Sequence, residues 1–197
     1  PAAEEMGRRG YYALRMGAAV KETVVSDSPR VIDYASNGRS DFMDIYLLAN
    51  CRFFLSSSSG LTGLACTFRV PLAYVDQVPL EYEPRGKRDM FIPKKIWLRN
   101  EKRFLTFREI VESGAGRFLR GDEFEALGLE LVENSKDDVM ALAVEMDERL
   151  EGKWDTSDED TDLQQRYWTL FDETTLCYNS PSRIGAAFLR QNRNLLD

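Results

Sequence analysis

Four consecutive serines followed by a glycine, Ser56 to Gly60, are the residues of this chain whose types and spacing best suit ligand chemistry. They follow the apolar segment 52–55, which predicts a strand, and precede the segment 61–68, which predicts a helix. A helix N-terminus offers free backbone N–H groups and the positive end of its dipole, and serine hydroxyls add donors. Capping alone would account for one serine. Four exceed that need, so the pattern favours an anion site.

Two arginines are placed to reach the same anion. Arg15 ends the predicted strand 11–15, and Arg39 precedes the predicted helix 42–50. A guanidinium pairs well with phosphate or carboxylate, although a surface arginine with a packed stem is the alternative for each. Gly60 is predicted to relieve a tight turn, and because no lysine follows it, the segment is not a Walker loop. The predicted anion-site residues are Arg15, Arg39, Ser57, Ser58, Ser59, Gly60 and Leu61.

Acid–base chemistry has few candidates, because the chain contains no histidine. This excludes a Ser-His-Asp triad and removes the commonest zinc ligand. Asp33 and Asp76 follow predicted strands, from which they could meet ribose or sugar hydroxyls. The acidic run 158–160 is interpreted as part of a solvated linker, and no metal site is predicted. No catalytic base is identified, so that group must be Asp, Glu, Lys, Tyr or Cys, or come from outside the chain.

Composition narrows the function classes. The net charge is −7 and the pI about 4.9, with no dominant basic stripe, so nucleic-acid binding is not predicted. The basic residues between Lys87 and Arg99 are interpreted as a solvated loop, with an anionic small ligand as an alternative. The three cysteines show no CxxC spacing; Cys51 and Cys66 are expected in the core. No apolar run reaches the ~18 residues of a membrane span, and a cytoplasmic location is predicted.

Strand and helix patterns alternate along most of the chain, which predicts βαβ units and a parallel sheet. The expected architecture is a three-layer α/β/α Rossmann-like domain over residues 1–152, with a mostly parallel sheet. Residues 153–197 are expected to form a helical extension that packs back on this domain or on a missing N-terminal half. Residues 79–104 are expected to be a long irregular loop. The predicted strands are 11–15, 31–34, 52–55, 72–75 and 129–132, and the predicted helices are 2–9, 42–50, 61–68, 106–111, 122–126, 135–150, 163–171 and 183–195. The predicted N-caps are Ser40 or Asp41, Thr106 with Glu109 as its capping-box partner, and Ser135.

In an open α/β sheet, ligands bind beyond the carboxyl ends of the strands. This rule selects the loops that follow Arg15, Tyr34, Leu55 and Val75. The loop after Leu55 is the serine run, so sheet topology and residue types point to the same place. The sequence therefore predicts a ligand cleft at the start of the helix 61–68.

Several segments spread over the chain resemble a bacterial glycosyltransferase family associated with surface polysaccharides. The segments that carry the resemblance are Val31-Ile32-Asp33-Tyr34, Arg39-Ser40-Asp41-Phe42, Cys51-Arg52-Phe53-Phe54, Ser58-Ser59-Gly60-Leu61, Ile92-Pro93-Lys94-Lys95, Leu105-Thr106-Phe107-Arg108-Glu109-Ile110, Arg183-Ile184-Gly185 and Phe188-Leu189-Arg190-Gln191-Asn192. The family looks like the two-Rossmann-domain (GT-B-like) glycosyltransferases, and this chain resembles their C-terminal half. One departure is the pure serine run, where Gly or Thr would be expected among the positions.

The resemblance implies a function and partners. The chain would bind a nucleotide-sugar donor at Ser57–Leu61, Arg15 and Arg39, with no other cofactor. An upstream Rossmann-like domain would bind a glycan or lipid-linked acceptor and supply the base. Two alternatives stay open: a non-catalytic nucleotide- or partner-binding module, and a sugar-nucleotide epimerase on the same fold.

Overall fold

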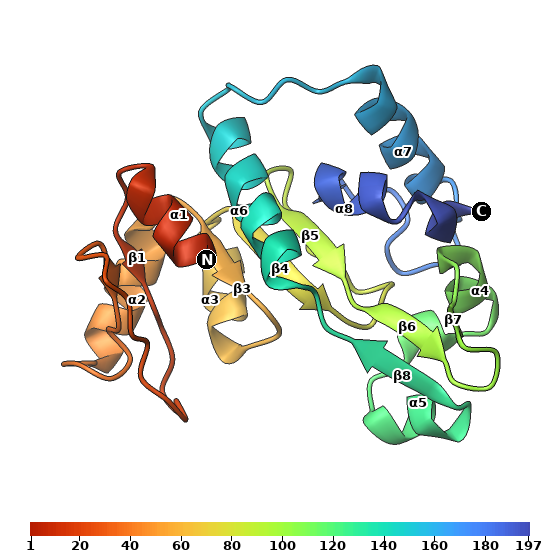
Figure 1. Ribbon diagram of the computed structural model, residues 1–197, viewed down its shortest axis with the longest axis horizontal. Helices are drawn as coiled ribbons and strands as arrows, with labels where there is room; N and C mark the ends of the chain where they lie inside the picture. Colours follow the sequence, from red (N-terminus) through yellow and green to blue (C-terminus); the bar gives the residue numbers. More distant parts are fainter.

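A four-stranded, fully parallel sheet lies at the centre of the computed structural model, which describes residues 1–197 (Figure 1). Its strands lie in the order β3-β4-β5-β9, with Phe54 opposite Leu72 and Tyr74 opposite Phe91. All four residues of β5 are buried, which explains why the sequence shows an apolar run without alternation. The bounds are β3 Phe54–Ser56, β4 Leu72–Gln77, β5 Met90–Pro93 and β9 Arg183–Ile184.

A separate pair of parallel strands, β1 (Ala13–Leu14) and β2 (Val31–Ile32), lies beside β3 at one end of the molecule. No backbone ladder joins β1 to β3, so the two sheets remain distinct. The first parallel sheet therefore has the order β1-β2 and the second the order β3-β4-β5-β9.

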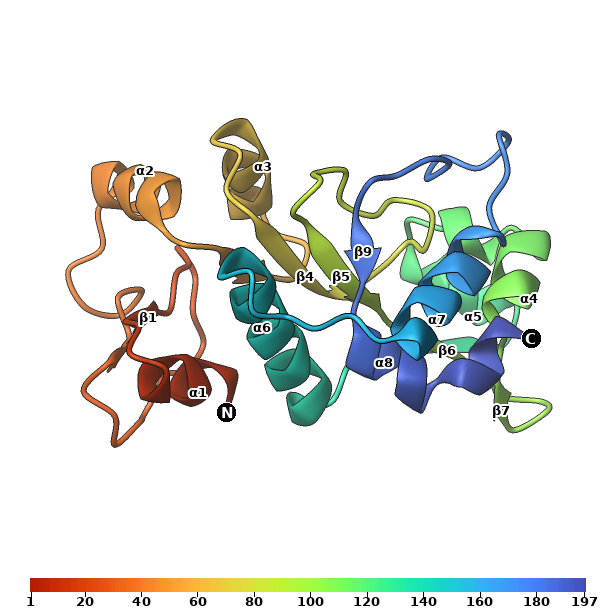
Figure 2. The same cartoon turned by 90° about the horizontal axis from the view of Figure 1, so that it is seen from above.

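Helices cover both faces of the parallel sheet, as Figure 2 shows. One layer contains α2 (Asp41–Asn50) and α3 (Gly60–Thr67), and the other contains α1 (Ala2–Arg8), α6 (Lys136–Leu150) and α8 (Ala186–Gln191). Outside α8 lie α7 (Asp158–Trp168) and the 3₁₀ turn η2 (Arg193–Leu196). This arrangement confirms the predicted three-layer, Rossmann-like α/β/α fold with a helical C-terminal tail.

The prediction of an irregular loop over 79–104 is wrong, because this region contributes three strands. After β5, the strands β6 (Lys95–Leu98) and β7 (Arg103–Phe104) join β8 (Leu129–Val132) in an antiparallel sheet ordered β7-β6-β8. Prolines and charges mask these short strands locally, and β6 becomes a strand by pairing with a distant segment. The elements around this sheet are α4 (Phe107–Glu112), η1 (Ala115–Arg117) and α5 (Gly121–Ala126).

Several helix starts follow from local capping and match the prediction. The Ser40 side chain accepts a hydrogen bond from the Met43 N–H, and Thr106 forms a capping box with Glu109. Ser135 caps α6, which ends at Leu150 as expected. These helix starts can be predicted from the sequence, because a cap and its hydrogen-bond partner lie within three residues of each other.

Two predictions about the C-terminal region are wrong. Residues 183–184 form strand β9 rather than the start of a helix, and Gly185 passes so close to β5 that a Cβ there would lie 2.9 Å from Cγ2 of Ile92. The acidic residues from Asp158 onward form the first turns of α7, capped by Ser157, rather than a linker. Acidic side chains at a helix N-terminus are favoured by the helix dipole, so this run had a helical interpretation as well.

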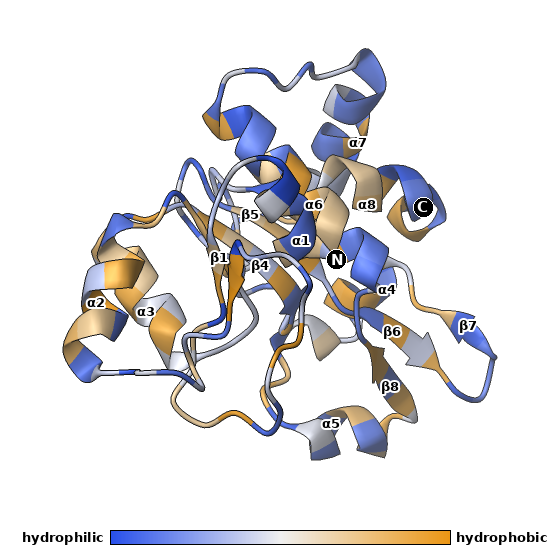
Figure 3. Cartoon of the chain, turned by 60° about the vertical axis from the view of Figure 1, so that its left-hand side comes forward, coloured by the Kyte–Doolittle hydropathy of each residue, from blue (hydrophilic) through white to orange (hydrophobic).

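Helix α2 exposes much of its apolar face, which the apolar spacing alone does not reveal. Phe42 is 73% exposed and Tyr46 52% exposed, and the two rings stack on each other, whereas Leu48 is buried. Figure 3 shows hydrophobic bands on α2, which lies beside α3 at the edge of the molecule.

Cys66 is exposed, contrary to the expected core position, and Cys51 is partly buried.

The main core joins the sheet to the C-terminal tail. Tyr167 of α7 is fully buried, with its ring centroid 5.3 Å from that of Phe107 and 6.0 Å from that of Phe91. Aromatic pairs at such distances add stability beyond the area they bury.

None of the helices is long and apolar enough to cross a bilayer.

Candidate functional site

A cleft of about 780 Å³ opens between β1 and β3, which belong to the two separate parallel sheets. Its walls are the segment around β1, the C-terminal part of α2, strand β3 and the serine loop, together with residues of α1 and α6. The lining is mostly apolar, with a few polar groups at the carboxyl ends of the two strands. Size, lining and position are those typical of a small-molecule site in an α/β fold.

The serine loop contributes one rim of this cleft. Ser57, Ser59 and Leu61 line it, while Ser58 and Gly60 do not. Ser59 is the N-cap of α3, yet its side chain makes no capping hydrogen bond; its Oγ lies 3.2 Å from Oγ of Ser56 instead. The Thr62 N–H donates to the Ser59 carbonyl at 3.1 Å. The N–H groups of Gly60 and Leu61, the first two of α3, receive no side-chain acceptor from the N-cap, which leaves them available to an anion.

Gly60 does not relieve a tight turn, contrary to the sequence-based expectation. It is the first residue of α3, has no left-handed φ, and a Cβ built on it would meet no atom within 4 Å. The backbone of the folded chain therefore does not require glycine at this position. A glycine at the start of a helix also lets a ligand come close to the backbone, and the open space around Gly60 is compatible with that role.

Arg15 lines the same cleft, at the carboxyl end of β1. Its guanidinium Nη1 donates to the Glu22 carbonyl and lies 3.5 Å from the Asp33 carboxylate. The hydrogen bond from the Val24 N–H, together with the Arg15 charge, holds the pKa of Asp33 below its usual value. Asp33 thus helps to hold Arg15 at the cleft rather than standing free to meet a sugar.

Arg39 and Asp76 serve structural contacts away from the cleft. Arg39 Nη2 lies 2.7 Å from the carboxylate of Asp44 and 3.0 Å from that of Asp41, so it braces the first turn of α2. Asp76 accepts a hydrogen bond of 2.7 Å from the Asn134 N–H and thereby ties the end of β4 to the segment after β8. The structure does not bring either residue to the serine loop.

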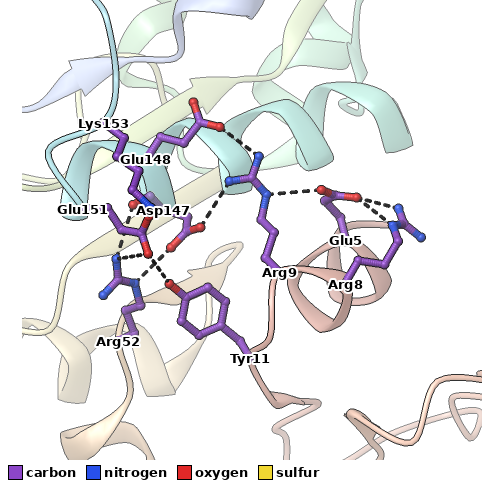
Figure 4. A network of polar contacts seen from close by, with 9 residues as sticks. All are labelled: Glu5, Arg8, Arg9, Tyr11, Arg52, Asp147, Glu148, Glu151 and Lys153. Atoms are coloured by element: carbon purple, nitrogen blue, oxygen red, sulfur yellow. Dashed lines mark hydrogen bonds and ion pairs between the residues drawn. The ribbon is translucent and has the colours of Figure 1, made fainter.

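A polar network holds the amino ends of the two cleft walls together (Figure 4). Asp147 of α6 is buried and accepts hydrogen bonds from Arg9 at 3.3 Å and from Arg52 at 3.0 Å. The Tyr11 hydroxyl donates to Glu151 at 3.0 Å. Burial, together with the two carboxylates, raises the pKa of Tyr11 to about 12. Side chains of α6 therefore link the segment before β1 to the segment before β3, in place of a backbone ladder.

Tyr11, Asn50 and Arg52 also line the cleft, and the sequence analysis did not select them. Tyr11 and Arg52 begin predicted strands and Asn50 ends a predicted helix, and whether they reach the cleft depends on how far apart β1 and β3 stand. The lining includes no Asp, Glu or histidine, and no group of three or more such residues with cysteine is placed to hold a metal ion. The cleft can bind an anion at one end and apolar or aromatic groups along its walls.

The basic residues between Lys87 and Arg99 do not form one patch. Lys94 lies 3.5 Å from the Glu133 carboxylate and Arg99 lies 3.4 Å from that of Glu130, both on the antiparallel sheet. Lys87 and Arg88 instead line a separate hollow before β5. The cluster seen in the sequence is therefore divided between two parts of the fold.

Comparisons with known proteins identify no relative of this chain. No family model, curated protein or solved structure matches the chain.

Proposed function

We propose that the cleft between β1 and β3 binds a nucleotide sugar, and that the chain is the donor-binding domain of a glycosyltransferase in the synthesis of surface polysaccharide or another glycan. The observation that carries this proposal is that Arg15 and the rim of Ser57 and Ser59 line one cleft, at the carboxyl ends of the parallel strands β1 and β3. Nucleotides bind at this position in doubly wound α/β folds.

The chemistry of the cleft suits the parts of such a donor. The free N–H groups at the start of α3 and the Arg15 guanidinium would bind the diphosphate, and the apolar walls with Tyr11 and Tyr12 would accept the nucleoside. In the reaction, the bond from the anomeric carbon to the diphosphate breaks as the acceptor oxygen forms a new bond to that carbon. The same N–H groups would stabilise the departing diphosphate.

The cleft lining offers no carboxylate and no histidine to take the acceptor proton. Its tyrosines and Cys51 are weak bases for this step, since burial raises the pKa of Tyr11 to about 12 and that of Cys51 to about 11. We therefore assign the base and the acceptor site, for a glycan or a lipid-linked sugar, to an upstream Rossmann-like domain. The enzyme would act in the cytoplasm, where nucleotide sugars are available.

The same observation supports a second candidate function, a module that binds a nucleotide without catalysis. The two candidates differ in one measurement. The full-length protein given the bound nucleotide sugar and an acceptor should release free nucleoside diphosphate if it is a transferase, and should release none if it only binds.

Ligand binding is tested by thermal shift with UDP, GDP, ADP, TDP and CMP. A ligand present at a hundredfold excess over its Kd should stabilise the fold by about 2.7 kcal/mol. At least one of these nucleotides should raise the melting temperature. A panel in which none does would contradict the proposal for this chain.

The site itself is tested by Ser59→Asp, because aspartate is as good an N-cap as serine but repels a phosphate. We expect the variant to be at least as stable as the native chain and to lose the nucleotide shift. The matched control is Ser40→Asp, the same substitution at the N-cap of α2 and outside the cleft lining. Equal binding by both variants would place the nucleotide elsewhere.

A further inference from the structure

A second hollow, of about 410 Å³, lies at the opposite end of the parallel sheet from the serine loop. It is bounded by the loop before β5, by the C-terminal end of α6 with the residues that follow it, and by the first residue of β9. The lining includes four cations, Lys87, Arg88, Arg149 and Arg183, and one acidic residue, Asp89. We call it the basic hollow.

Part of this positive charge has no ion-pair partner. Arg149 lies 2.8 Å from the Glu145 carboxylate, whereas Lys87, Arg88 and Arg183 form no ion pair, although Arg88 donates to the Arg69 carbonyl at 3.2 Å. The Asp89 carboxylate accepts hydrogen bonds from the N–H groups of Leu72 and Gly86, at 3.0 and 2.8 Å, and keeps its negative charge. The four cations outnumber the two carboxylates, although the chain as a whole carries a charge of −7, and this excess gives the hollow a local field that attracts anions.

Two residues that line the hollow carry hydrogen-bond donors without partners. Nε of Arg183 and Nε1 of Trp154 are both buried and have no acceptor. A buried donor left unpaired destabilises the fold, so a ligand acceptor that reaches either group would remove that cost. The Arg149 guanidinium lies 5.0 Å from the centroid of the Trp154 ring, which holds both side chains at the edge of the hollow.

We propose that the basic hollow is a second ligand site, which binds a small phosphate-bearing molecule of charge −2 or more. Arginine forks and a lysine ammonium together suit phosphate oxygens, and three cations without an ion-pair partner match a multiply charged group rather than a single carboxylate. Met90, Met146 and Leu150 would contact the organic part of the ligand. The site is distinct from the nucleotide cleft, since the two lie at opposite ends of parallel strands and share no lining residue.

The test is a titration of the full chain with inorganic pyrophosphate, followed by calorimetry and by tryptophan fluorescence, at constant ionic strength. It is carried out in the Ser59→Asp background, so that binding at the serine loop does not contribute. We expect one site, a fluorescence change that is lost in Trp154→Phe, and weaker binding of citrate than of pyrophosphate.

The decisive variant combines Lys87→Glu with Arg88→Glu, because both side chains are exposed and the substitutions should not affect folding. Pyrophosphate affinity should fall at least tenfold. The control combines Lys21→Glu with Lys136→Glu, two exposed cations outside the hollow, which changes the net charge by the same amount. Unchanged affinity in the first variant, or an equal loss in the control, would overturn the site.

Citrate that binds as tightly as pyrophosphate would overturn the assignment to phosphate. A failure of this second site can be distinguished from a failure of the nucleotide site. The variant that combines Lys87→Glu with Arg88→Glu, in the otherwise native chain, should keep the nucleotide-induced rise in melting temperature. Loss of that shift in this variant would show that the two sites are not independent.

Discussion

At the scale of single residues, the two arginines predicted to bind the same anion have different surroundings. Arg39 forms ion pairs with Asp44 and Asp41. Arg15 lines the cleft, donates a hydrogen bond to a backbone carbonyl and forms an ion pair with Asp33. An arginine already held by two carboxylates gains little from a third anion. We therefore expect Arg15, and not Arg39, to contribute to nucleotide affinity.

Glu83, in the segment between β4 and β5, is the residue from which we predict a pH dependence. Its side chain lies in the interior, with the residue 5% exposed, and this burial raises the pKa of Glu83 to about 7, against an ordinary value of 4.5. The neighbouring Cys177 thiol is affected too, since burial and the Glu83 charge raise its pKa to about 12. The folded chain thus keeps a proton on Glu83 at pH values where the unfolded chain has lost it.

The free energy of unfolding should therefore fall as the pH rises from about 4.5 to about 7, and level off above that, with a total loss of about 3 kcal/mol. Glu83→Gln should remove this slope, so that the variant equals the native chain near pH 5 and exceeds it at pH 8. Urea unfolding across this range measures both. The control is Glu125→Gln, an exposed glutamate without an ion pair; identical slopes in native chain and Glu83→Gln would contradict the prediction.

At the scale of elements, the β1–β2 pair is attached to the rest of the fold by side chains rather than by a strand ladder. Its contacts run through α1, which packs on α6, and through the network centred on Asp147. This attachment matters for the cleft, because the same network sets the distance between the two walls. An element held in this way can open without breaking a sheet.

Asp147→Ala should release Arg9 and Arg52 together and lower the free energy of unfolding by about 2–3 kcal/mol, the value of charged hydrogen bonds in a partly buried setting. Amide hydrogen exchange in residues 11–15 should accelerate more than in β4. The control is Glu148→Ala, which removes one contact to Arg9 from a more exposed position and should cost less than about 1 kcal/mol. Equal effects of the two substitutions would show that Asp147 is not the centre of the attachment.

At the scale of the whole molecule, the C-terminal tail takes part in the central sheet. It supplies β9, which pairs with β5, and it places Tyr167 within the main core between Phe107 and Phe91. A boundary at residue 152 would thus separate β9 from its sheet. The chain should therefore unfold as one cooperative unit.

Tyr167→Ala leaves a cavity in this shared core and should cost about 3–5 kcal/mol. Because the cavity belongs to both parts, near-UV and far-UV circular dichroism should show one coincident transition, shifted to a lower temperature. Tyr178→Ala, at a half-exposed tyrosine of the tail, should change the midpoint little. Two separate transitions, only one of them shifted, would indicate that residues 153–197 form an independent unit.

The features that the sequence determined by itself are those encoded by near neighbours. Ser40, Thr106 with Glu109, and Ser135 predicted helix starts, because a cap acts within three residues. Alternating strand and helix patterns predicted the α/β layers, and the serine run predicted a loop between β3 and α3. The order of these elements also placed that loop at the carboxyl end of a parallel strand.

Only the tertiary structure decided what depends on distant pairs. Strand β6 exists because it pairs with β8, and the basic hollow exists because Arg183 returns beside Lys87 from the far end of the chain. The same holds for the cleft, whose width follows from the missing ladder between β1 and β3 and from the Asp147 network that replaces it. Backbone pairing and charge compensation between remote segments are determined by the packing of the whole chain, so local residue patterns do not predict them.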